Sequence, residues 1–128
     1  MKKITAFLCA LALSPLVALA GDFADISHDE LKQAIADKKV VLIDVNGSDS
    51  WKGGHIPGAI DFQTAKADLA SKLPADKGAL VVAYCGNEKC GAYAAGAKKA
   101  KELGYTNVKH YAPGIAGWKA KEATEKGS

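Results

Sequence analysis

The sequence predicts an α/β protein whose sheet is mostly parallel, and two observations support this fold class. The first is a pair of nearly continuous apolar segments, residues 40–45 and 79–84, which are typical of strands covered on both faces. The second is that segments with a helical spacing of apolar residues separate the strands, so that strands and helices alternate. Strands are expected at residues 40–45, 59–62, 79–84 and 107–112, and helices at residues 27–37, 64–73 and 93–103, with a helical turn near Ser50 and a terminal helix after the turn at residues 113–118.

Several helix ends carry local signals. Ser27 and Glu30 have the spacing of a capping box, in which each side chain accepts a hydrogen bond from the other residue's backbone N–H. Gly104 follows the helix expected at residues 93–103 and is a natural C-cap. Small residues such as Gly96 and Ala97 lie on the apolar stripe of that helix, so we expect it to pack close to the sheet. Trp118 is expected to be a core residue.

The first twenty residues have the layout of a secretory signal peptide. Lys2 and Lys3 precede an apolar segment, and small residues lie before Gly21. We therefore expect cleavage after Ala20, which leaves residues 21–128 as one domain in the periplasm, with no membrane attachment after cleavage. Cys9 lies within the predicted leader and is expected to be removed with it.

Charge and composition exclude several classes of function. All seventeen basic residues are lysines, and removal of Lys2 and Lys3 leaves fifteen basic and fourteen acidic side chains, a net charge of +1. No basic stripe is interleaved with aromatic residues, so nucleic acid is not an expected partner. The three histidines lack the spacing of a zinc site, and we expect no metal.

Cys85 is the candidate nucleophile. It lies between the strand expected at residues 79–84 and the following helix, at the end of the sheet where α/β proteins place their chemistry. A thiol near a helix N-terminus has a lowered pKa and is a better nucleophile at neutral pH. A buried structural cysteine would have the same sequence context.

Asp44 is expected at the same end of the sheet, after the strand at residues 40–45. We interpret it as a hydrogen-bonded anchor for the loop. A bare carboxylate beside Cys85 would raise the pKa of the thiol and oppose its activation.

Five motifs in register resemble the rhodanese-like family, and together they cover essentially the whole of residues 21–128. They are Leu42-Ile43-Asp44-Val45, Gly54-His55-Ile56-Pro57-Gly58-Ala59, Val82-Ala83-Tyr84-Cys85, Leu103-Gly104-Tyr105-Thr106-Asn107-Val108 and Pro113-Gly114-Ile115-Ala116-Gly117-Trp118. The chain looks most like the single-domain periplasmic rhodaneses. The resemblance implies a five-stranded parallel sheet between two layers of helices.

The same resemblance implies a sulfurtransferase in which Cys85 becomes a persulfide and needs no cofactor. The donor would be thiosulfate or another persulfide, and the acceptor a thiol, cyanide or a protein. Backbone N–H groups of the loop would bind the sulfur anion, and the glycines at its two ends would relieve the cost of a tight curl. The loop residues are Gly86, Asn87, Glu88, Lys89, Cys90 and Gly91. A monomer is expected.

The sequence departs from the family at three positions. Asn46, Gly86 and Cys90 stand where arginine is usual or frequent, and Lys89 is the cation that the loop retains. Lysine attracts an anion but cannot donate two parallel hydrogen bonds to a sulfonate as arginine does. The resemblance therefore does not establish thiosulfate as the physiological donor.

Three alternatives follow from the same residues. The phosphatases of this fold need a longer loop ending in a phosphate-binding arginine, and the chain has none. A non-catalytic sulfur carrier or binding module is consistent with the missing arginines. A dithiol redox protein would use Cys85 and Cys90, although their spacing is not that of thioredoxin-like enzymes. We expect Cys90 to modulate the site, through an optional and easily reduced bond to Cys85, without being required for sulfur uptake.

Overall fold

The computed structural model describes residues 23–127, and the predicted leader and its cleavage site lie outside this range. Five parallel strands form one sheet in the order β1-β5-β4-β2-β3. The strands are β1 (Ala24–Asp25), β2 (Val41–Asp44), β3 (Ile60–Asp61), β4 (Leu80–Tyr84) and β5 (Asn107–His110). The helices are α1 (His28–Ala36), α2 (Ser48–Gly53), α3 (Phe62–Ala65), the 3₁₀ helix η1 (Lys66–Ser71), α4 (Tyr93–Glu102) and α5 (Gly114–Lys119). The predicted three-layer α/β fold is confirmed.

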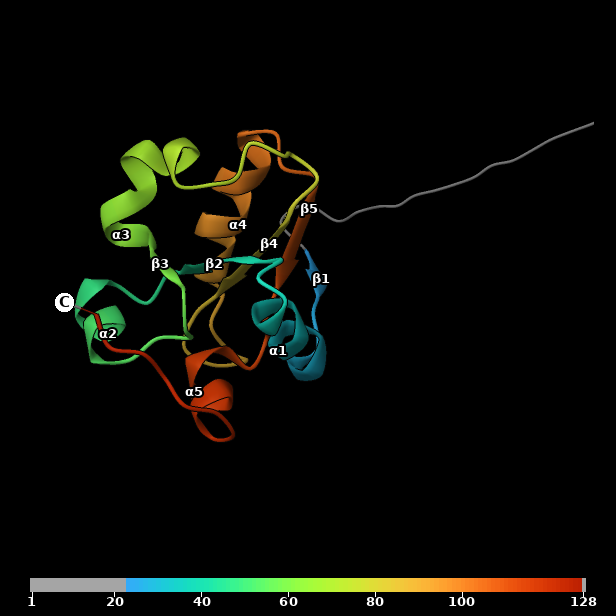
Figure 1. Cartoon of the computed structure of the whole chain (residues 1–128). Helices are drawn as coiled ribbons and strands as arrows, with labels where there is room; N and C mark the ends of the chain where they lie inside the picture. Colours follow the sequence, from blue (N-terminus) through green and yellow to red (C-terminus); the bar gives the residue numbers. More distant parts are fainter. Residues whose placement is uncertain (1–22, 128) are drawn as a thin grey trace, which may run out of the picture.

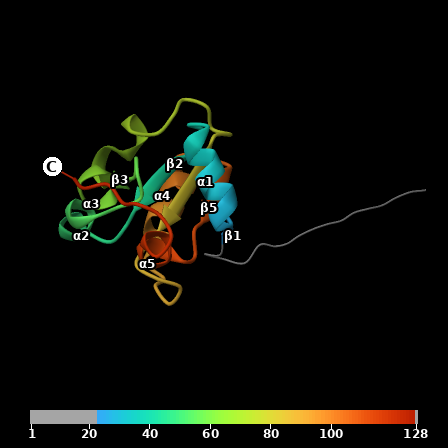
Figure 2. The same cartoon turned by 60° about the horizontal axis from the view of Figure 1, so that its bottom comes forward.

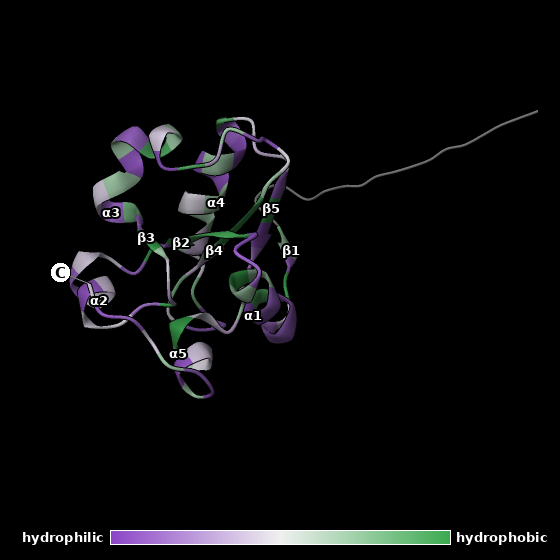
Figure 3. Cartoon of the chain, in the orientation of Figure 1, coloured by the Kyte–Doolittle hydropathy of each residue, from purple (hydrophilic) through white to green (hydrophobic). Residues whose placement is uncertain are grey.

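Helices cover both faces of the sheet. In Figure 1, α1 and α5 lie on one side and α3 and α4 on the other, and Figure 2 brings α1 and α5 in front of the sheet. Alternation along β4 divides its side chains between two clusters, with Val82 and Tyr84 in one and Val81 and Ala83 in the other. Hydrophobic residues concentrate on the central strands (Figure 3), as a sheet covered on both faces requires.

Several predicted helix details are confirmed. Ser27 accepts a hydrogen bond from the Glu30 amide, and the Glu30 side chain accepts one from the Ser27 amide. Gly104 has φ +101° directly after the Leu103 C-cap, a conformation that favours glycine. A Cβ at Gly96 would lie 2.9 Å from Cγ2 of Ile43, so the absence of a side chain allows α4 to approach β2 closely.

The prediction of one continuous helix at residues 64–73 is wrong, because this segment forms α3 and then η1. The Asp61 side chain accepts a hydrogen bond from the Gln63 amide, so α3 already begins at Phe62 and β3 is shorter than expected. The helical path then breaks at Asp68, which has φ −132° and ψ 36°. Its carboxylate and carbonyl oxygens both accept hydrogen bonds from the Ser71 hydroxyl, a local interaction that competes with helix continuation.

Strand β1 was not expected from the sequence. It contributes only Ala24 and Asp25, paired with Lys109 and His110 of β5, and both of its residues are exposed. So short a segment has no alternation of apolar and polar residues that could predict a strand.

Candidate active site

Cys85 lies immediately after β4, at the carboxyl end of the sheet. It is 1% exposed, and the preceding Tyr84 pairs in register with Asp44 at the end of β2. The backbone therefore turns away from the sheet at the position predicted for the nucleophile, because Tyr84 ends the strand there.

The N-terminal part of α5 holds the backbone on either side of this turn. The Ile115 amide donates a hydrogen bond to the Cys85 carbonyl at 2.9 Å, and the Ala116 amide donates one to the Gly86 carbonyl at 3.0 Å. Helix α4, by contrast, begins only at Tyr93, after the loop is complete. The helix that anchors the Cys85 backbone is therefore the one that comes later in the chain, not the one that follows directly.

Cys85 and Cys90 are joined by a disulfide, with their Cα atoms 6.2 Å apart. The intervening chain turns at Asn87, whose side-chain oxygen accepts a hydrogen bond from the Lys89 amide and whose carbonyl accepts one from the Cys90 amide. These two N–H groups are thus used within the loop in the oxidised state. Binding of a sulfur anion by them would require the turn at Asn87 to rearrange.

The expected role of Gly86 and Gly91 in a tight curl is wrong. Neither has a positive φ, a Cβ at Gly91 would meet no atom within 4 Å, and one at Gly86 would make an ordinary contact with Asn46. The glycine that the turn requires is Gly114, which has φ +65°. A Cβ there would lie 2.6 Å from the Cys85 carbonyl oxygen. Its sequence signal is the Pro113-Gly114 pair, which predicts a turn and belongs to the last of the five rhodanese-like motifs, but which local patterns do not connect with Cys85.

Asp44 is a buried anchor, as predicted. It is 1% exposed and accepts hydrogen bonds from the Tyr84 hydroxyl at 2.7 Å and from the Asn46 amide at 2.8 Å. The Tyr84 hydroxyl in turn accepts a hydrogen bond from the Ile56 amide at 3.0 Å. Burial raises the pKa of Asp44, and burial together with the Asp44 charge raises that of Tyr84. This network joins the ends of β2 and β4 to the segment before β3.

The middle of the loop faces solvent. Asn87, Glu88 and Lys89 are exposed, while Gly86 and Cys90 are partly exposed. Asn46, which stands where the family usually carries arginine, lies beside the loop, with its Oδ1 3.6 Å from the position of a Cβ on Gly86. The structure therefore brings together Cys85, the predicted loop and Asn46 at one end of the sheet.

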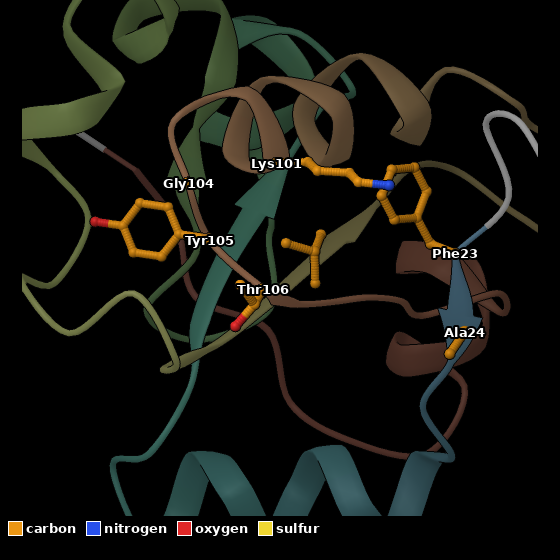
Figure 4. Close-up of a pocket in the computed structure, with 7 residues that line it drawn as sticks. Phe23, Ala24, Lys101, Gly104, Tyr105 and Thr106 are labelled. Carbon is orange, nitrogen blue, oxygen red and sulfur yellow. The ribbon is translucent and has the colours of Figure 1, made fainter. Parts of the chain in front are cut away.

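A pocket of about 500 Å³ lies at the opposite end of the sheet, where β5 begins. Figure 4 shows Lys101 extending toward Phe23, with its Nζ 6.0 Å from the centre of the ring, while Tyr105 points away from the pocket and donates a hydrogen bond to the Pro74 carbonyl. The pocket is separate from the Cys85 site, since Cys85 follows the last residue of β4.

Among residues 23–127 there is no group of three or more histidine, cysteine or acidic side chains placed to hold a metal ion. Within the same range, no helix is both long and apolar enough to span a membrane.

Comparison with known proteins identifies the family. The sequence model of the rhodanese-like domain matches residues 27–121. An HTH-type transcriptional regulator of Mycobacterium tuberculosis is 32% identical over 95 residues, which are 73% of this chain and 41% of that protein. The chain thus spans less than half the length of this curated relative. The protein belongs to the rhodanese-like domain family.

Solved structures share the fold. The 3-mercaptopyruvate sulfotransferase SseA of Escherichia coli matches with a TM-score of 0.66 at 18% identity, over 84% of this chain and 52% of that one. A human single-domain sulfurtransferase matches with a TM-score of 0.59 at 24% identity, over 77% and 97% of the two chains. A rhodanese of Escherichia coli solved with anions matches with a TM-score of 0.51 at 28% identity, over 69% and 99%. The fold is that of the sulfurtransferases.

Proposed function

We propose that the protein is a rhodanese-type sulfurtransferase that moves a sulfane sulfur through a persulfide on Cys85. The observation that carries the proposal is the position of Cys85, buried at the carboxyl end of β4 and followed by a loop whose backbone α5 anchors. Membership of the rhodanese-like family supports the same chemistry.

The reaction begins from the reduced protein. The Cys85 thiolate attacks the sulfane sulfur of thiosulfate or of a persulfide, the S–S bond of the donor breaks, and sulfite or a thiolate leaves with the electron pair. An acceptor thiol, cyanide or an acceptor protein then takes the terminal sulfur and regenerates the Cys85 thiolate. Amides of the loop, including those of Glu88 and Gly91, are the proposed donors to the sulfur anion. Lys89 supplies a positive charge beside them.

Sulfur uptake by the reduced protein tests the proposal. After treatment with thiosulfate or glutathione persulfide, we expect the intact mass to increase by one sulfur atom. If the sulfur is transferred from Cys85 before the mass is recorded, we expect to detect the sulfite or glutathione that the donor releases. Cys85→Ser should show neither. If Cys85→Ser retains both uptake and transfer to cyanide, Cys85 is not the nucleophile. Uptake from glutathione persulfide with little turnover of thiosulfate would favour a sulfur carrier.

A second candidate is a dithiol redox protein, because Cys85 and Cys90 form a disulfide in the structure. If the wild-type pair is reduced and reoxidised, and Cys90→Ser takes up no sulfur, the dithiol redox function becomes the favoured proposal over the sulfurtransferase.

We further propose that the protein is the single-domain periplasmic type, exported and released by cleavage after Ala20, and that it acts as a monomer. The charged start, the apolar segment and the small residues before Gly21 support export. A periplasmic location agrees with a disulfide between Cys85 and Cys90, since oxidising compartments maintain such bonds.

A further inference from the structure

The sulfurs of Cys85 and Cys90 are bonded to each other as a disulfide. The loop between them closes through the turn at Asn87, and the Cys85 backbone stays hydrogen-bonded to Ile115 of α5. In this structure the Cys90 sulfur thus reaches the Cys85 sulfur while the Cys85 carbonyl accepts a hydrogen bond from α5. A persulfide on Cys85 would carry its S–S bond at this same sulfur.

We propose that Cys90 is a resolving thiol, which attacks the Cys85 persulfide and releases its terminal sulfur as hydrosulfide. The inference rests on the proposed sulfur uptake by Cys85 and adds the fate of the sulfur and a second catalytic residue. It differs from the view of Cys90 as a residue that only modulates the site.

The step balances within the protein. The Cys90 thiolate attacks Sγ of Cys85, a bond forms between the two cysteine sulfurs, and the bond from Cys85 Sγ to the terminal sulfur breaks. The terminal sulfur leaves with the electron pair and, once protonated, is hydrosulfide. The sulfane sulfur is reduced, the two cysteines are oxidised to the disulfide, and no outside oxidant is needed. This step forms the same Cys85–Cys90 bond that the structure contains.

The different exposure of the two cysteines indicates which sulfur of the disulfide an external reductant attacks. Cys85 is 1% exposed, whereas Cys90 is partly exposed and follows the exposed Lys89. An external dithiol therefore reaches the Cys90 sulfur, forms a mixed disulfide there and frees Cys85 as the leaving thiolate. A second attack within the dithiol releases Cys90. The partner that this cycle requires is a dithiol reductant. The net products are hydrosulfide, the oxidised dithiol and the sulfite or thiol left by the sulfur donor.

Intramolecular attack has a kinetic consequence. A thiol held at the reacting atom acts with a high effective concentration, so Cys90 competes with small acceptors in solution. We expect wild-type protein to yield hydrosulfide, and Cys90→Ser to retain the persulfide and pass it to cyanide.

The experiment follows single turnover of the chain 21–128 after reduction and removal of the reductant. Thiosulfate and glutathione persulfide are the donors, because neither releases hydrosulfide when it gives up one sulfur. Hydrosulfide is trapped with a bimane reagent while intact mass is recorded. The variants are Cys90→Ser, Cys85→Ser and, as a control for an added serine hydroxyl, Ala95→Ser at an exposed position of α4.

We expect wild type and Ala95→Ser to release about one equivalent of hydrosulfide and to end two hydrogen atoms lighter, as the disulfide. Cys90→Ser should gain one sulfur atom and release hydrosulfide at least about tenfold more slowly. Cys85→Ser should do neither.

Two outcomes separate the inference from the proposed function. If Cys90→Ser takes up sulfur and wild type holds its persulfide equally long, Cys90 is not a resolving thiol and the sulfurtransferase proposal stands. If Cys90→Ser takes up no sulfur from either donor while its Cys85 remains reactive toward an alkylating reagent, the sulfurtransferase proposal fails, and the resolving role fails with it.

Discussion

Gly114 shows how a single residue outside the loop controls its position. Its Cα approaches the backbone so closely that a Cβ would lie 2.6 Å from the Cys85 carbonyl oxygen and 2.8 Å from the Asn87 amide nitrogen. These are backbone atoms, which cannot rotate away as a flexible side chain can. Gly91 lies inside the loop but has open space around it. Closeness in sequence to Cys85 is therefore a poor guide to which glycine the site needs.

At the residue scale, we predict that Gly114→Ala destabilises the reduced protein by about 2 to 5 kcal/mol. A left-handed conformation costs a residue with a side chain roughly 1–2 kcal/mol, and displacement of packed atoms adds about 1–3 kcal/mol. Gly91→Ala should change stability by less than about 0.5 kcal/mol. Urea unfolding measures both. Equal stability of the two variants would contradict the proposed close packing of Gly114 on the loop.

At the scale of the elements, the segment after α5 is attached to the rest of the domain through Glu125. Residues His55 and Glu125 form a two-way backbone bridge, and the Glu125 carboxylate lies 3.0 Å from the Gly58 amide nitrogen and 3.2 Å from Nε2 of His55. His55 in turn stacks on Trp51 of α2 with ring centres 4.2 Å apart. Glu125 thus connects the C-terminal segment to α2 and to the turn before β3.

This attachment predicts a dependence of stability on pH. The hydrogen bond from the Gly58 amide, with a further contribution from His55, lowers the pKa of Glu125 below its ordinary value of 4.5. A lowered carboxyl pKa stabilises the folded state above 4.5, and this contribution is lost as pH falls through the lowered value. Glu125→Gln should therefore be less stable than wild type near neutral pH, with the difference shrinking below pH 4.5.

Thermal unfolding between neutral pH and the acid range measures this difference, and Glu102→Gln at an exposed position of α4 is the control. The raised pKa of Asp44 acts in the opposite direction, since protonation there favours the folded state, but it is common to all three proteins. A difference that stays constant with pH would mean that the Glu125 charge does not contribute.

On the scale of the whole molecule, two hydrophobic clusters within residues 23–127 cover the two faces of the sheet. The clusters contain side chains from β2 and β4 on opposite faces, such as Leu42 and Val82 on one and Ile43 and Val81 on the other. A chain that starts at Gly21 retains every one of these contacts.

From the leader pattern we predict that the exported protein begins at Gly21, and that it folds without residues 1–20. Intact mass of the protein from the periplasmic fraction should correspond to residues 21–128. A species that keeps Met1 and stays with the membrane fraction would contradict export with cleavage. As a control, the chain 21–128 produced without the leader should show the same thermal unfolding as the exported form.

Local sequence patterns determined the class of fold and the place of Cys85 at the end of the sheet. Apolar runs in β2 and β4, the capping box at Ser27 and the small residues of α4 depend on neighbours within a few positions, so they could be recognised along the chain. The turn from β4 into the loop likewise placed Cys85 at the end of the sheet. These features were predicted correctly because short-range periodicity and capping specify them.

Only the tertiary structure decided how the site is held together. The contact of Gly114 with Cys85 and the hydrogen bonds from α5 join residues about thirty positions apart, and the pairing of Ala24 with Lys109 in β1 joins more distant ones. Such contacts depend on the path of the whole chain, and no local period encodes them. The bond between Cys85 and Cys90 is local in sequence, yet it needed the curl at Asn87 to bring the two sulfurs together.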